Sequence, residues 1–370
     1  MIFVEKNREN LPTISQVLSM VGEMTSKMPV RHRMPYDEPV DDSDAFLLNR
    51  TASGLFTLKP NITKQPCLFF GDSDYHKDLQ PTWNRFKSRD EFLVQNVLRE
   101  EFELTMLSHP LCSLFRKGIP TRRQPVRIIN PFGIAMAYGF PSPMIPLTSS
   151  LETAVFFATH KYNVQTNQWD AVAEKDEQGN VNVGVLYVLE LAMPFPMMMG
   201  LSCIGMQAFK RPGNQRLFGL NIPAGENFNN HRLVYGFQFR QKPEEVSTIS
   251  EKYNGGELLC PDELIARKAA DILKYRRVSE AAFELNCKNN PRDDHEGNRK
   301  KLKAAGVEIV NEPLHLFTAK ELESTYYPTA EQEWEEMFSK VVAVHPGFDR
   351  LLEDIRNFPN TDEGQKYFRK

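Results

Sequence analysis

The stretch at residues 137–160, AYGFPSPMIPLTSSLETAVFFATH, constrains the fold more than any other part of the chain. Three prolines interrupt any regular helix there, and three consecutive hydroxyl residues, Thr148, Ser149 and Ser150, begin two positions after the last proline. Ser149 stands three residues before Glu152, which is the spacing of a capping box at a helix start. We predict a turn through the Pro-Met-Ile-Pro segment and then a buried helix that begins near Ser150.

The composition predicts a packed fold. Hydrophobic residues make up 41% of the 370 residues and charged residues 25%, values typical of globular proteins. The length allows one main domain with helical additions. We divide the chain into an N-terminal helix with an irregular segment (1–64), an α+β domain (65–280) and a mostly helical C-terminal extension (281–370).

Charge and cysteine content limit the partners and the compartment. The net charge of -3 gives no global attraction to nucleic acid. The cationic run at 116–127, RKGIPTRRQPVR, is more typical of a solvated loop than of a nucleic-acid site, although it keeps that interpretation open. Five cysteines without a Cys-x-x-Cys pair favour reduced thiols. The chain start resembles no signal peptide and no apolar run is long enough to span a bilayer, so we expect a cytoplasmic location without a membrane partner.

Periodicity predicts the order of elements along the chain. We expect a mixed, twisted sheet formed mainly by residues 65–260 and flanked by helices. The predicted helices cover residues 14–21 with a cap at Thr13 or Ser15, residues 89–109, residues 130–140 and the segment after Pro261. The predicted strands cover Cys67 to Phe70, the central run from Val183 to Leu191, two pieces near 217 and 234, and a brief strand that opens at Glu257. Trp334, Phe338, Val341 and Val342 predict an apolar helical face near the C-terminus.

Several common catalytic motifs are missing from the sequence. It contains no Gly-x-Gly-x-x-Gly, phosphate-binding P-loop, Gly-x-Ser-x-Gly or His-Glu-x-x-His pattern. The eight histidines lie apart from one another and from the cysteines. We therefore predict no metal site.

The segment MAYGFPSPMIPLTSSLETAVFFA resembles the FRG-domain family. In that family a Phe-Arg-Gly motif is followed by a Tyr-Gly-Leu-Pro segment, a Thr-x-Ser turn and a helix rich in alanine and phenylalanine. Tyr138, Gly139, Thr148, Ser150 and Phe157 stand in the matching order. LFFGDSD lies upstream, where the Phe-Arg-Gly is expected, and RPGNQRLFGL resembles a later family strand with Gln215 at its glutamine. The resemblance covers about residues 10 to 280.

The chain departs from the family at two places. Phe70 stands where the family has arginine, and Pro146 and Leu147 replace the usual Asp-Trp. A phenylalanine cannot form the cationic contact of an arginine, so either this contact is lost or another cation, such as Arg85 or Arg127, supplies it.

A second, weaker resemblance, to arginine-type ADP-ribosyltransferases, implies a mechanism. LTSSLETAVFFA is similar to the strand-to-helix corner of those enzymes, and GGELLCPDEL is similar to their glutamate strand. The resemblance implies NAD as the cofactor and Glu257 as the catalytic carboxylate, which would stabilise oxocarbenium charge. Thr148, Ser149 and Ser150 would order the ribose and the glutamate, with Ser150 counted as catalytic.

The remaining residues of the implied NAD site have alternative interpretations. Tyr138 or Phe157 would offer a ring to the nicotinamide, but Tyr138 is also typical of a packed aromatic. Gln215 would contact the ligand or bridge backbone groups. Glu257 would serve the reaction or simply stand exposed after a turn. We therefore expect an NAD-using transferase or glycohydrolase, or else an inactive module on the same fold that binds a ligand or a protein.

Overall fold

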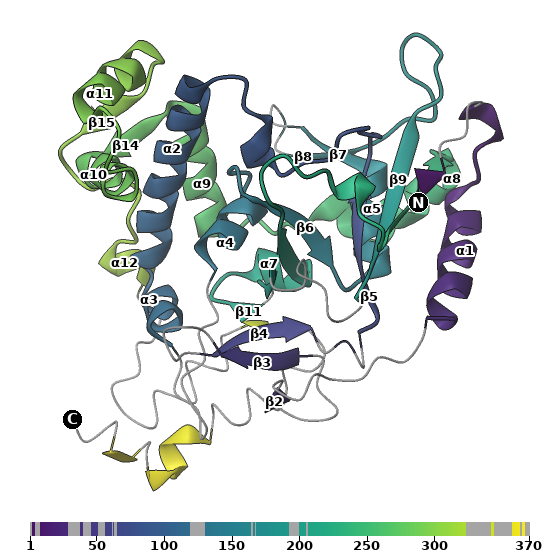
Figure 1. The fold of residues 1–370 in the computed structure, drawn as a ribbon, viewed down its shortest axis with the longest axis horizontal. Helices are drawn as coiled ribbons and strands as arrows, with labels where there is room; N and C mark the ends of the chain where they lie inside the picture. Colours follow the sequence, from purple (N-terminus) through teal and green to yellow (C-terminus); the bar gives the residue numbers. More distant parts are fainter. Residues whose placement is uncertain are drawn as a thin grey trace.

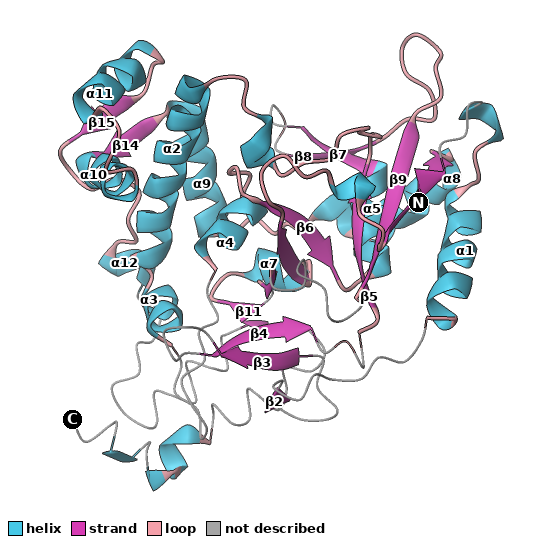
Figure 2. Ribbon diagram, viewed as in Figure 1, coloured by secondary structure: helices cyan, strands magenta, loops and turns pink. Residues whose placement is uncertain are grey.

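The computed structural model describes residues 2–3, 8–28, 38–39, 46–50, 56–60, 62, 65–118, 130–163, 166, 168–191, 200–204, 206–322, 342–343, 357–362 and 365–366. Its centre is a seven-stranded sheet in the order β1-β13-β9-β5-β6-β12-β10. Six of these strands are antiparallel to their neighbours, and the edge strand β1 (Ile2–Phe3) runs parallel to β13. Figure 2 shows β5, β6 and β9 of this sheet in magenta, with helices to either side of them. The predicted mixed α and β architecture is therefore confirmed.

The strand β9 (Val183–Glu190) is an inner strand of the sheet, as the sequence predicts. It pairs with β13 (Val234–Arg240) on one side and with β5 (Cys67–Asp72) on the other. Apart from its two ends, every residue of β9 is buried. A continuous apolar run suits this position because helices cover both faces of the sheet.

The other half of the sheet contains β6 (Met144–Thr148), β12 (Leu217–Asn221) and β10 (Leu201–Cys203). The predicted turn through Pro-Met-Ile-Pro is wrong, because β6 is a strand that pairs with β12 along its whole length. Its pairing with β5 is limited to Phe69 and Thr148. A proline has no N–H to donate, so Pro146 fits a strand that lacks a second full partner.

One face of the sheet is covered by α1 (Ile14–Ser26), α5 (Leu151–Thr159) and α8 (Pro243–Lys252). The predicted cap of α1 is confirmed, since Thr13 forms a capping box with Gln16. The carboxylate of Glu245 in α8 accepts the N–H of Ile14 and of Ser15, at 3.1 and 3.0 Å. These bonds join the first turn of α1 to α8.

Helix α5 approaches the sheet closely at Gly71. A Cβ atom placed there would lie 1.7 Å from the carbonyl oxygen of Ala154 and 2.9 Å from the amide nitrogen of Ala158. No other residue type leaves this space free, so the glycine of the predicted Phe-Phe-Gly segment is required by packing.

The opposite face is covered by α2 (Arg89–Leu107), α4 (Pro131–Ala137) and α9 (Leu264–Tyr275), which Figure 1 shows beside the sheet. The predicted helices at 89–109, at 130–140 and after Pro261 are thereby confirmed, with ends shifted by a few residues. Ser88 and Asn130 cap the first two of them through their side-chain oxygens.

The C-terminal part packs directly on α2. It contains β14 (Arg277–Ser279), α10 (Glu280–Asn289), α11 (His295–Ala304), β15 (Glu308–Val310) and α12 (Ala319–Leu322). Residues 280–322 are thus mainly helical, with a parallel β14–β15 pair beside them. Phe283 and Leu302 belong to the same hydrophobic cluster as the sheet, so the predicted boundary at residue 280 crosses one continuous core.

Smaller elements complete the described structure. Trp334, Phe338 and Val341 lie outside the described residues, whereas Val342 belongs to a strand and not to the predicted helix. The further elements are β2 (Glu38–Pro39), β3 (Phe46–Arg50), β4 (Phe56–Pro60), β7 (His160–Asn163), β8 (Gln168–Ala171), β11 (Met206–Gln207), β16 (Val342–Ala343), α3 (Pro110–Lys117), α7 (Lys210–Asn214), and the 3-10 turns η1 (Arg8–Asn10), η2 (Thr82–Arg85), η3 (Phe228–Asn230), η4 (Asn254–Gly256) and η5 (Phe358–Asn360).

Candidate functional site

The candidate site lies where β6 ends and α5 begins, and we call this point the Thr148 corner, defined by residues 148–150. The hydroxyl of Thr148 donates to the backbone oxygen of Gln215 at 2.7 Å and accepts the N–H of Ser150 at 3.0 Å. Thr148 is only 5% exposed. Its hydroxyl therefore satisfies two buried backbone groups of the chain itself.

The helix cap at this corner is Ser150, so the predicted capping box of Ser149 and Glu152 is wrong. The hydroxyl of Ser150 accepts the N–H of Thr153 at 3.2 Å. The N–H of Ser149 donates to the backbone oxygen of Arg216 at 3.4 Å, which extends the β6–β12 ladder by one residue. Helix α5 consequently starts one residue later than the capping box requires, and Glu152 pairs with Lys252.

Gln215 connects the corner to the segment that follows α8. Its backbone oxygen accepts the bond from Thr148, while its side-chain nitrogen donates to the backbone oxygen of Leu259 at 3.2 Å. The residue is 7% exposed. Of the two roles that the sequence left open, the structure thus has Gln215 bridging backbone groups.

Glu257 lies in a turn, so the predicted strand at this position is wrong. Asn254, Gly255 and Gly256 have φ angles of +49°, +61° and +99°, which wind the chain tightly after α8. The N–H groups of Leu259 and Cys260 then bond back to the oxygen of Gly256, at 3.0 and 2.8 Å. A chain folded back in this way cannot extend into a strand.

The turn that carries Glu257 packs beside the helix that follows the Thr148 corner. A Cβ atom on Gly256 would lie 2.8 Å from a ring carbon of Trp169 and 2.9 Å from one of Phe156, so the turn packs on β8 and α5. Glu257 itself is exposed, and its carboxylate accepts a hydrogen bond from the side chain of Asn254. Gln215 lies between the turn and Thr148 and hydrogen bonds to both segments.

The two candidate aromatic residues lie in different surroundings. Phe157 is half-buried on α5, with its ring 5.2 Å from that of Trp169, on the side of the Glu257 turn. Tyr138 is buried in the core on the other face of the sheet, with its ring 5.5 Å from that of Phe102. Tyr138 is therefore a packed residue and not part of the corner.

The polar atom of Tyr138 is also engaged within the chain. Its hydroxyl donates to the carboxylate of Glu263 at 2.6 Å, and the guanidinium of Arg211 lies 4.8 Å from the ring centre. Burial, together with the negative charge of Glu263, raises the pKa of Tyr138 well above its usual range.

Phe70 is partly buried and packs against the core, and of the two cations named from the sequence only Arg85 lies within the described residues. The ring of Phe70 stacks on that of Tyr187 at 5.6 Å. Arg85 donates to the backbone oxygen of Gln80 at 2.7 Å, and Arg127 lies outside the described residues. In the cationic run, Arg116 forms an ion pair with Glu103 at 3.5 Å.

Arg216 is a cation at the corner that sequence reasoning missed. Its φ of +48° is unusual for a residue with a side chain and costs about 1 kcal/mol or more. It is half-buried, and its guanidinium has no hydrogen bond or ion pair with any residue that the structure describes. Its position directly after Gln215, a residue that the sequence singled out, was the available signal, but periodicity could not show the left-handed backbone.

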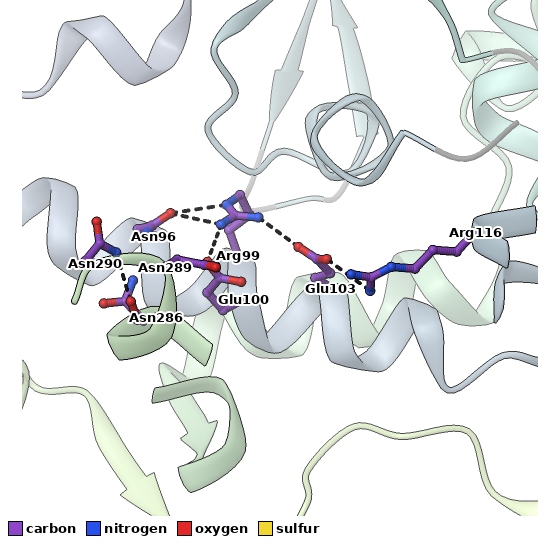
Figure 3. Close-up of polar contacts among 8 residues, drawn as sticks. All are labelled: Asn96, Arg99, Glu100, Glu103, Arg116, Asn286, Asn289 and Asn290. Atoms are coloured by element: carbon purple, nitrogen blue, oxygen red, sulfur yellow. Dashed lines mark hydrogen bonds and ion pairs between the residues drawn. The ribbon is translucent and has the colours of Figure 1, made fainter. Parts of the chain in front are cut away.

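A second polar cluster lies inside the helical layer formed by α2 and α10 (Figure 3). Arg99 donates to Asn96, Glu100 and Glu103, and the side chain of Asn289 donates to Glu100 at 3.0 Å. Glu100 is fully buried and only one of its two oxygens has a partner among the described residues.

Glu101, the next residue of α2, fixes the start of α10. Its carboxylate accepts the backbone N–H of Ser279 at 2.7 Å and the hydroxyl of the same residue at 2.6 Å. Burial raises the pKa of both Glu100 and Glu101, against the lowering effect of Arg99 on Glu100 and of Ser279 on Glu101.

Comparisons of the chain with protein-family models, curated proteins and solved structures found no match. In the described part of the chain, no helix is both long and apolar enough to cross a membrane. Among the same residues, no group of three or more His, Cys, Asp and Glu side chains could hold a metal ion. The five cysteines form no disulfide, and three of them are buried.

Proposed function

We propose that the Thr148 corner is a binding module for a phosphorylated nucleotide of the NAD or ADP-ribose type, and that it does not turn this ligand over. Arg216 supports the binding, because an arginine whose guanidinium has no partner among the described residues can form the bidentate contact that phosphate prefers. The half-buried ring of Phe157 supports it as well, since an aromatic ring can stack on a base.

Two hydrogen bonds of Thr148 support the proposal that the protein does not convert the bound nucleotide. A hydroxyl that already bonds to Gln215 and Ser150 has little capacity left to order a ribose. Glu257, on an exposed turn, would act in water, where a carboxylate stabilises positive charge far less than in a dry site.

The test measures binding and reaction separately. We expect NAD and ADP-ribose to raise the unfolding temperature of the full chain in a saturable manner, because a ligand of the folded state stabilises it. We also expect no release of nicotinamide from NAD. Arg216→Ala should weaken binding about tenfold, the effect of losing one charged hydrogen-bonding group.

Arg267→Ala is the matched control, since Arg267 is an exposed arginine on α9 that pairs only with Asp262 in the described structure. The affinity of the Arg267→Ala variant for NAD and ADP-ribose should equal that of the unchanged protein. If Arg216→Ala and Arg267→Ala bind the nucleotides equally well, Arg216 is not part of the site. If neither nucleotide shifts the unfolding temperature, the alternative of a protein-binding module remains.

A second candidate function, ADP-ribosyl transfer or NAD hydrolysis, is favoured by the packing of the Glu257 turn on α5 and by the bond from Gln215 to the segment that follows it. Under this alternative the unchanged protein releases nicotinamide, and Glu257→Ala abolishes release without a change in stability. Glu251→Ala, which alters another exposed glutamate nearby, should keep the activity. Release that persists in Glu257→Ala would reject the catalytic role of this residue.

A further inference from the structure

A cavity of about 90 Å³ lies away from the Thr148 corner, between the first turns of α2, the end of α10 and α11. This volume is several times the ~10–15 Å³ that one water molecule needs on the same measure, so the cavity has room for more than one water-sized group. The cavity is lined by Arg89, Asp90, Phe92, Leu93, Asn96, Asn286, Asn290, Asp293, Asn298 and Lys301.

The charged residues of this lining balance one another. Arg89 pairs with Asp293 at 2.6 Å, and Lys301 pairs with Asp90 at 2.8 Å. Both pairs join α2 to the segment around α11 at the solvent-facing rim. Because each charge already has an opposite partner, the cavity offers no net attraction to an ion.

The buried part of the lining presents amide hydrogen-bond donors. The side-chain oxygen of Asn96 accepts two bonds from Arg99, at 3.3 and 3.1 Å (Figure 3). A guanidinium can only donate, so the amide nitrogen of Asn96 faces away from it. Asn286 is 2% exposed, lines the cavity, and its amide nitrogen has no partner among the described residues.

Acceptors and an apolar patch complete the lining. The amide nitrogens of Asn290 and Asn298 donate within the chain, to the backbone oxygen of Asn286 and to Asp293. Their side-chain oxygens accept no hydrogen bond from the residues that the structure describes. Phe92 and Leu93 add carbon surface beside these amides.

We propose that this cavity binds a small neutral ligand with several hydroxyl groups, of the monosaccharide or polyol class. A hydroxyl both donates and accepts, so a group of them can satisfy the amide nitrogens of Asn96 and Asn286 together with the oxygens of Asn290 and Asn298. The C–H face of such a ligand matches Phe92 and Leu93. A buried amide donor without a partner is costly, and a ligand hydroxyl that bonds to the amide of Asn286 would remove this cost.

The test is titration calorimetry of the full chain with D-glucose, D-ribose and myo-inositol, and with inorganic phosphate and ADP-ribose as charged probes. We expect saturable binding of at least one neutral probe in the millimolar range or below. Asn286→Leu, which keeps the side-chain shape without the donor, should weaken binding about tenfold or more. Asn298→Trp, which fills the cavity, should abolish it.

Asn289→Leu is the matched control, because it makes the same change on α10 at a residue outside the cavity lining. Its affinity should be unchanged even though the bond from Asn289 to Glu100 is lost. Binding that is equal in Asn286→Leu and Asn289→Leu would overturn the proposal, and so would no binding of any neutral probe. Binding of the charged probes alone, sensitive to Asn286→Leu, would overturn the neutral ligand class.

Discussion

The buried side chains of Thr148 and Gln215 at the Thr148 corner are hydrogen bonded within the chain, whereas several buried polar atoms in the layer of α2 and α10 lack a partner among the described residues. At the corner, the side chains of Thr148 and Gln215 bond to backbone groups of neighbouring segments. In the helical layer, Asn286, Glu100 and Glu101 each keep one buried polar atom without a partner among the described residues. The corner's polar residues are thus explained by folding, whereas the helical layer has hydrogen-bonding capacity that folding does not use.

The largest expected effect concerns the close packing that holds the corner together. Gly71→Val should lower the free energy of unfolding by about 3 kcal/mol, because its side chain would meet the backbone of α5. Gly22→Ala is the control: it adds a methyl group to α1 in open space and should raise stability by about 0.5–1 kcal/mol. Urea unfolding measures both, and equal effects would show that α5 can move aside.

Two matched substitutions test whether hydrogen bonding stabilises the corner but not the helical layer. Thr148→Val removes the donor to the buried oxygen of Gln215 and should destabilise the protein by about 2 kcal/mol. Asn286→Leu removes a buried donor that has no described partner, so it should leave stability unchanged or raise it by about 1 kcal/mol. Effects of the same sign in urea unfolding would contradict the contrast between the two regions.

The smallest expected effect is a pH dependence in the helical layer. Burial raises the pKa of Glu101 above its ordinary value of 4.5, so the folded state binds this proton more tightly than the unfolded state. The stability contributed is complete below pH 4.5 and is lost as the pH rises through the folded pKa. Glu101→Gln should therefore gain stability relative to the unchanged protein between pH 4.5 and neutral pH. Parallel curves of unfolding free energy against pH would refute this.

Most of the fold was predictable because its signals are local. The apolar run of β9, the capping residue of α1 and the period of α2 each depend on a short segment, and all three elements form as expected. The strand expected at Glu257 does not form, because Asn254 adopts a left-handed conformation that periodicity does not reveal. The turn predicted around Pro146 was wrong, because only the pairing of β6 with its neighbours shows that a proline fits a strand there.

The candidate site was harder to predict because it depends on contacts between distant segments. The sequence named Thr148, Gln215 and Glu257, and the structure links Thr148 through Gln215 to the segment that follows Glu257. It could not show that the hydroxyl of Thr148 bonds internally, that Tyr138 lies in the core on the other face, or that Arg216 stands beside Ser149. The cavity beside α10 had no motif, since asparagines from three helices and a connecting loop form it.

The single pairing between β5 and β6 has a consequence for how the protein opens. Phe69 and Thr148 form the only residue pair between these two strands. The half of the sheet that contains β5, β9 and β13 can therefore separate locally from the half that contains β6, β12 and β10, while the strands within each half stay paired. Helix α5 continues from β6 and packs against Gly71 of β5, so it holds the two halves of the sheet together. Amide protons next to the β5–β6 pairing should therefore exchange with solvent sooner than those between β9 and β13, and loosening α5 should widen the difference.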